Sequence, residues 1–157
     1  MNAPGLFSDR SLLVLDLVIL AAIAAVPLLY IAWRYARSGR WATHRNVMLV
    51  TTAVLGVAVV AVELALNAAG GVFVMAEGST YDGTTLLAAS LWIHVAFASL
   101  TSLWWPALIA LSLWRFSRPP KPGSFSRIHK IGGYGGLILM ALTGLTAAEL
   151  YVVAFLL

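Results

Sequence analysis

The segment NVMLVTTAVLGVAVVAVELALNAA, residues 46–69, decides the fold class of this chain. Its only charged side chain is Glu63. About 20 helical residues, at a rise of about 1.5 Å each, cross the roughly 30 Å hydrocarbon core of a bilayer. Residues 46–69 therefore predict a membrane-spanning helix that carries one carboxylate.

Similar apolar runs cover residues 11–33, 85–114 and 131–155. The whole chain has 157 residues, of which 61% are hydrophobic and 10% charged, whereas soluble domains have about 25% charged residues. We predict an all-α integral membrane protein with one domain, residues 1–157, folded as an up-down four-transmembrane-helix bundle. The expected helices cover approximately residues 11–36, 44–69, 84–116 and 126–156.

Basic residues mark one side of the predicted bundle. Nine of the ten fall in two short connecting segments: Arg34, Arg37, Arg40 and Arg45 in the first, and Arg115, Arg118, Lys121, Arg127 and Lys130 in the second. The positive-inside rule makes these segments cytoplasmic, so both termini are expected outside. This topology accounts for the net charge of +4, and no nucleic-acid partner is predicted.

Each predicted helix carries one ionisable residue at a similar depth. Asp16, Glu63, His94 and Glu149 lie 18 to 21 residues from the basic edges of their helices, which corresponds to about 27–31 Å. Ionisable side chains are costly in a bilayer and mainly face the bundle interior. A histidine and three carboxylates could bind zinc, iron, manganese or copper, so these four residues are the predicted metal site near the outer face. A hydrogen-bonded polar packing layer and side chains reaching for the headgroups are the alternatives.

A second pair of candidate ligands lies at the basic side. THRNVM opens the second helix with His44, and RIHKIGGYGG opens the fourth with His129, so the two histidines should share one depth. They could ligate a b-type haem, with space left by Gly132, Gly133, Gly135 and Gly136 and with cations for the propionates. Close helix packing at Gly132 and Gly136, with headgroup contacts for the histidines, would explain the same pattern.

The chain contains no cysteine, which excludes disulfides, thiolate metal sites and thiol catalysis. It also contains no glycine-rich phosphate loop and no nucleophile elbow. The sequence therefore favours a binding protein over an enzyme.

The order HRNVM, LWIHVAFASLTSLWWPALIALSLWR and RIHKIGGYGGLILMALTG resembles the bacterial domain-of-unknown-function family 420 over about residues 25–150. That family includes CtaM/YozB-like membrane proteins associated with assembly of haem–copper cytochrome c oxidase. The family's histidines match His44, His94 and His129. Asn67 stands where relatives have a further histidine, and Glu63 lies one turn earlier, so the resemblance implies a divergent member of such a family.

The resemblance implies a multi-pass protein of the bacterial inner (cytoplasmic) membrane, working with a respiratory complex or as a homo-oligomer. Our first expectation is a metal-binding assembly factor or accessory subunit that uses the carboxylate and histidine site. One alternative is an electron-transfer subunit with haem b between His44 and His129. The other is a purely structural subunit that docks through the tryptophan-bearing third helix.

Overall fold

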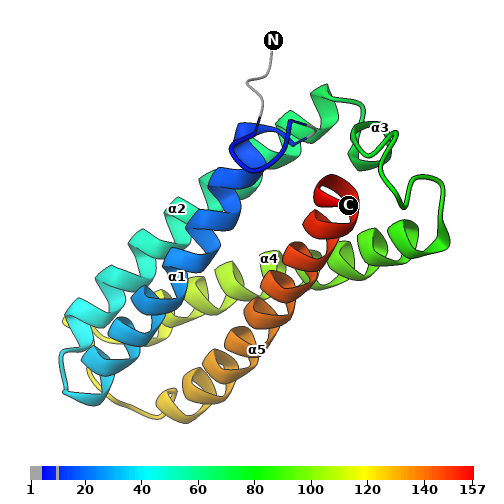
Figure 1. Ribbon diagram of the computed structural model, residues 1–157. Helices are drawn as coiled ribbons and strands as arrows, with labels where there is room; N and C mark the ends of the chain where they lie inside the picture. The colour runs from blue at the N-terminus through cyan, green and yellow to red at the C-terminus, as the bar shows by residue number, and fades with distance from the viewer. Residues whose placement is uncertain (1–4, 10) are drawn as a thin grey trace.

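The computed structural model describes residues 5–9 and 11–157. The described residues are 78% helical and form no strand. Four long helices account for most of the structure (Figure 1): α1 (Leu13–Arg37), α2 (Trp41–Ala68), α4 (Thr85–Arg115) and α5 (Ser126–Tyr151). The prediction of four apolar helices is therefore confirmed.

All four helices are long and apolar enough to cross a membrane. Their outward surfaces are apolar as well: Val57 is 71% exposed, Leu103 is 73% exposed and Trp114 is 75% exposed. Apolar surface on this scale is unfavourable in water and favourable against lipid tails. The chain is a multi-pass membrane protein.

The helix ends follow local chemistry. Between α1 and α2 the chain turns over three residues, and Gly39 there has a φ of +77°, a backbone conformation that favours glycine. The helix α4 begins after Thr84, whose side chain accepts a hydrogen bond from the backbone N–H of Leu87. The connection from α4 to α5 contains three prolines, which prevent a continuous helix.

The long helices associate as two pairs. The helix α1 packs along α2, and α4 packs along α5, whereas contacts between the pairs are sparse. Glycines on α5 allow the close approach of α4, because a Cβ at Gly136 would lie 2.9 Å from the ring of Trp105 and one at Gly132 would lie 3.0 Å from Leu108. Small residues thus serve packing between α4 and α5 at these two positions.

The two pairs meet at one end, which we call the α3 end. The short helix α3 (Val72–Met75) and the π-helical turn Val152–Leu156 lie there, and the sequence predicted neither. Figure 1 shows the last turn of the chain beside α3 and the first described residues at the same end of the molecule. The main buried apolar cluster joins these segments: Leu15, Ala76, Leu87, Leu150, Tyr151, Val153, Ala154 and Phe155.

Candidate cofactor site

A cavity opens at the opposite end, which we call the basic end because the cationic connections lie there. Its volume is about 550 Å³, within the range of roughly 300–1,000 Å³ that is typical of cofactor and ligand sites. All four long helices and the connection between α4 and α5 line it. The sparse contact between the helix pairs leaves this space between them.

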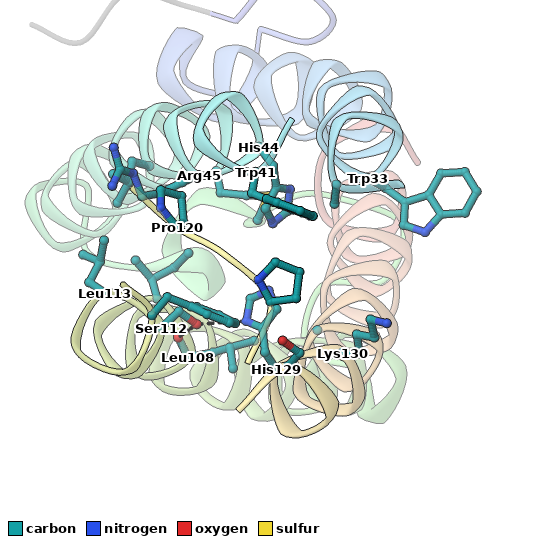
Figure 2. A pocket seen from close by; sticks show the side chains of 18 of the residues that line it. Trp33, Trp41, His44, Arg45, Leu108, Ser112, Leu113, Pro120, His129 and Lys130 are labelled. Carbon is teal, nitrogen blue, oxygen red and sulfur yellow. Dashed lines mark hydrogen bonds between the residues drawn. The ribbon is translucent and has the colours of Figure 1, made fainter. Parts of the chain in front are cut away.

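His44 of α2 and His129 of α5 lie on opposite sides of this cavity (Figure 2). Their ring centres are 6.1 Å apart, and the ring planes are at 81° to each other. Both residues are half-buried. The structure therefore brings together the two histidines that the sequence placed at one depth.

Each histidine uses its Nδ1 atom in a hydrogen bond within its own helix pair. His44 Nδ1 lies 2.9 Å from the carbonyl oxygen of Ala32, and His129 Nδ1 lies 2.9 Å from Ser112 Oγ. A carbonyl oxygen can only accept, so Nδ1 of His44 carries the proton and donates. The Nε2 atom of His44 is then the one with a free lone pair.

The same tautomer follows for His129 from the position of the Ser112 proton. The Ser112 hydroxyl donates its hydrogen to the carbonyl oxygen of Leu108, at 2.6 Å. Its oxygen can then only accept from His129, so His129 is also protonated on Nδ1. Within the described part of the chain, neither Nε2 atom has a hydrogen-bond partner. Both rings can thus offer a neutral Nε2 ligand.

The separation of the rings fits one shared metal ion. Metal–imidazole bonds are about 2 Å long, so two rings on opposite sides of one ion have centres about 6 Å apart. The observed 6.1 Å agrees with that arrangement. Ligating histidines also commonly donate their other N–H to a carbonyl or a similar acceptor, as both of these histidines do.

Aromatic side chains hold His129 in place. The ring of Phe116 lies edge-on to His129 with the centroids 5.3 Å apart, and Phe125 lies 6.3 Å away. Both phenylalanines come from the ends of the α4–α5 connection, and they also pack on each other. This apolar wall limits rotation of the imidazole.

The mouth of the cavity is cationic. No Asp or Glu lies among the described residues that line it, whereas five cations do: Arg37, Arg45, Arg118, Lys121 and Lys130. The guanidinium of Arg37 lies 5.2 Å from the centre of the Trp33 ring, in a cation–π arrangement. The electrostatics of this end favour an anionic ligand whose body is apolar.

Of the four glycines expected to make room for a macrocycle, only Gly133 lines the cavity. A Cβ there would meet nothing within 4 Å. Gly132 and Gly136 instead receive side chains of α4, and a Cβ at Gly135 would lie 3.7 Å from the Trp104 ring. Three of the four glycines thus lie against side chains of α4, and one borders the cavity.

At the predicted outer metal site, Asp16 has hydrogen-bond partners of its own. Asp16 is fully buried and accepts hydrogen bonds from Ser11 Oγ at 3.1 Å, from the Tyr151 hydroxyl and from the N–H groups of Leu6 and Phe7. It thus ties α1 to the C-terminal end of α5.

Among the described residues, the other three predicted ligands form no hydrogen bond with Asp16. Glu149 accepts a hydrogen bond from Ser90 Oγ at 2.7 Å, and His94 Nδ1 lies 3.2 Å from Thr146 Oγ1. Glu63 is exposed on α2. In the portion of the chain that the structure describes, no three His, Asp or Glu side chains form a group that could hold a metal ion.

The sequence-based predictions missed two groups that contact the histidines at the basic end. A serine inside an apolar helix, such as Ser112, is a common residue, and the carbonyl of Ala32 is a backbone group. Ser112 does lie three residues before Arg115, the same inner edge that places His129. Depth counting could therefore have flagged Ser112, but not its contact with His129.

Comparison with known proteins gives no relative for this chain. No protein-family model, no curated protein and no solved structure matches it.

Proposed function

We propose that this chain is a b-type haem-binding membrane protein that transfers electrons, in which His44 and His129 would hold the haem iron. The observation that carries the proposal is the pair of half-buried imidazoles whose centres lie 6.1 Å apart across a cavity of about 550 Å³. Two histidines from different helices can hold a haem iron from both sides. The electron-transfer alternative from the sequence thus has more support than the outer metal site.

The residues around the pair prepare it for ligation. Hydrogen bonds to Ala32 and Ser112 keep the proton of each histidine on Nδ1. The lone pair of each Nε2 atom is therefore available to bind a metal ion. Phe116 and Phe125 keep the ring of His129 oriented. A bound haem would supply a reversible one-electron couple.

The cations at the mouth would hold the propionates. Arg45 lies next to His44 in the chain and Lys130 lies next to His129, and both line the cavity. Arginine and lysine form charge-assisted hydrogen bonds with carboxylates. Arg45 and Lys130 would therefore bind the propionates at the basic end.

We further propose that the basic end faces the cytoplasm of a bacterium and that both termini lie outside, as an up-down bundle in the inner membrane requires. The haem edge would then exchange electrons at the cytoplasmic side. An accessory or assembly role beside a respiratory haem–copper oxidase is proposed from the resemblance of the histidine-bearing segments alone.

The test is an absorption spectrum with haem quantification on protein purified in mild detergent. We expect about one haem per chain and a Soret band that shifts on reduction in the manner of six-coordinate, low-spin haem. His44→Ala and His129→Ala should each abolish this spectrum. His94→Ala is the matched control, because His94 lies outside the cavity, and it should retain the haem.

The proposal is wrong if the purified protein stays colourless after haem addition, or if His129→Ala retains a six-coordinate spectrum. Elemental analysis of the same sample tests the outer site. A stoichiometric transition metal lost in Glu63→Ala and retained in His129→Ala would favour the first expectation instead.

A further inference from the structure

Among the described residues, one side-chain hydrogen bond joins the two helix pairs away from the α3 end. The indole N–H of Trp105 on α4 donates to Thr52 Oγ1 on α2, at 2.9 Å. Within residues 5–9 and 11–157, the other side-chain hydrogen bonds between the pairs involve Ser8, Ser11, Asp16 and Tyr151 at the α3 end. Trp105 and Thr52 therefore link the pairs where few other contacts do.

Trp105 is firmly held on its own side of this link. It is 7% exposed, and its ring packs so closely on α5 that a Cβ at Gly136 would come within 2.9 Å of it. Gly136 itself is buried. The indole therefore cannot swing away from α2 without disturbing the packing of α4 on α5.

The link lies just below the histidine pair. Thr52 follows His44 by eight residues, about 12 Å along α2, and Trp105 precedes Ser112 by seven residues, about 10 Å along α4. Trp105 also lines the cavity. The bridge therefore meets the cavity through Trp105, on the membrane-interior side of the histidines.

We propose that the Trp105–Thr52 bridge is a positioning element that sets the separation of α2 from the α4–α5 pair, and thereby the distance between His44 and His129. This inference rests on the proposed haem function. The groups of a binding site must be held within about 0.5 Å of their working positions. The distance between two histidines that bind one iron must therefore be kept to about the same precision. With sparse contacts between the pairs, this bridge is the inter-pair hydrogen bond nearest to the histidines among the described residues.

The test removes either half of the bridge. Thr52→Val replaces the hydroxyl with a methyl group, and Trp105→Phe removes the N–H donor but keeps an aromatic ring. Trp104→Phe is the matched control, because the Trp104 indole donates to Gly132 O within the α4–α5 pair and Trp104 does not line the cavity.

With haem bound, Thr52→Val and Trp105→Phe should each raise the high-spin fraction, let ferrous haem bind carbon monoxide, and weaken haem binding about fivefold. The double variant should bind haem about as weakly as the more severe single variant, because both substitutions remove the same hydrogen bond. Trp104→Phe should keep the wild-type low-spin spectrum. A wild-type spectrum and haem affinity in Thr52→Val would overturn the proposal while leaving the haem function intact.

A measurement without haem separates the two claims. Because the chain has no cysteine, spin labels can be placed at Thr43→Cys on α2 and Ile128→Cys on α5, both exposed. The label-to-label distance distribution should broaden in Thr52→Val and stay narrow in Trp104→Phe. Equal distributions in all three proteins would contradict the positioning role even if the wild-type protein bound no haem.

Discussion

At the scale of single residues, the proton of Ser112 decides which nitrogen of His129 is free. The hydroxyl donates to Leu108 O and accepts from His129, so it serves as a fixed acceptor rather than a freely rotating group. Partners of this kind orient metal-bound histidines, and their loss commonly weakens metal affinity about 10- to 100-fold. Ser112 is therefore as specific a test of the site as the histidines are.

We expect Ser112→Ala to release haem at least about tenfold faster than the wild-type protein, whereas Ser112→Thr retains the acceptor oxygen and should release it at a similar rate. Transfer of haem to a scavenging globin measures these rates. Ser102→Ala, at an exposed position of the same helix, is the control. Wild-type release from Ser112→Ala would show that His129 needs no partner at Nδ1.

Asp16 belongs to the same scale but has a structural role at the α3 end. Removing its carboxylate would leave the N–H groups of Leu6 and Phe7 without this acceptor, and the Tyr151 hydroxyl would keep only Ser11 Oγ. We expect Asp16→Ala to lower the free energy of unfolding by about 3 kcal/mol, because buried groups without partners cost about 1–3 kcal/mol each. Thermal unfolding in detergent measures this, with the exposed Glu77→Ala as control.

Asp16→Ala also distinguishes a structural carboxylate from a metal ligand. A structural role predicts loss of stability with unchanged metal content. If the variant instead loses a bound metal at wild-type stability, Asp16 is a ligand and not a structural tie between α1 and α5.

At the scale of elements, hydropathy was sufficient for the four long helices because each must present an apolar surface over its whole length. The same uniformity hides helix rotation, since nearly every face of α2 or α4 is apolar. Counting residues therefore gave Glu63 and Asp16 the same depth, but it could not show that Asp16 turns toward Tyr151 while Glu63 is exposed. Counting residues was enough to predict that His44 and His129 lie at one depth, because the cations beside them mark where their helices begin.

The segments that the sequence missed are short and stabilised by tertiary contacts. The helix α3 has four residues, and the π-helical turn at the C-terminus has five. Local hydropathy cannot separate such turns from the apolar runs beside them. Their positions depend on the buried cluster that joins Leu15, Ala76 and Phe155.

The packing of α4 on α5 supports a prediction at this scale. Gly136→Ala would place a methyl group 2.9 Å from the Trp105 ring, and overpacking of this kind costs about 1–3 kcal/mol. We expect a drop of about 2 kcal/mol in the free energy of unfolding. Gly144→Ala, where nothing lies within 4 Å, should be neutral or slightly stabilising. Equal stability of both variants would mean that Trp105 can move aside.

At the scale of the whole molecule, the two ends are built differently. The α3 end is tied together by the apolar cluster and by Asp16, whereas the basic end holds the helix pairs apart around a cavity. A rigid end opposite an open one allows a ligand to enter between the pairs without unfolding either of them. The cations at the open end would then select an anionic ligand.

The orientation in the membrane decides on which side that ligand would enter. Basic residues concentrate around the turn between α1 and α2 and around the connection between α4 and α5, and the positive-inside rule predicts a cytoplasmic location for both. Because the chain lacks cysteine, single cysteines can report this directly. We choose Ser124→Cys in the α4–α5 connection and Glu77→Cys after α3, both at exposed positions.

In intact spheroplasts, a membrane-impermeant maleimide should label Glu77→Cys and leave Ser124→Cys unlabelled until the membrane is permeabilised. Labelling of both residues after permeabilisation is the control for reactivity. The opposite pattern in intact cells would place the histidine pair and its cationic mouth at the outer face. Haem and its electron donor would then have to reach the protein from outside, which would contradict a cytoplasmic electron-transfer role.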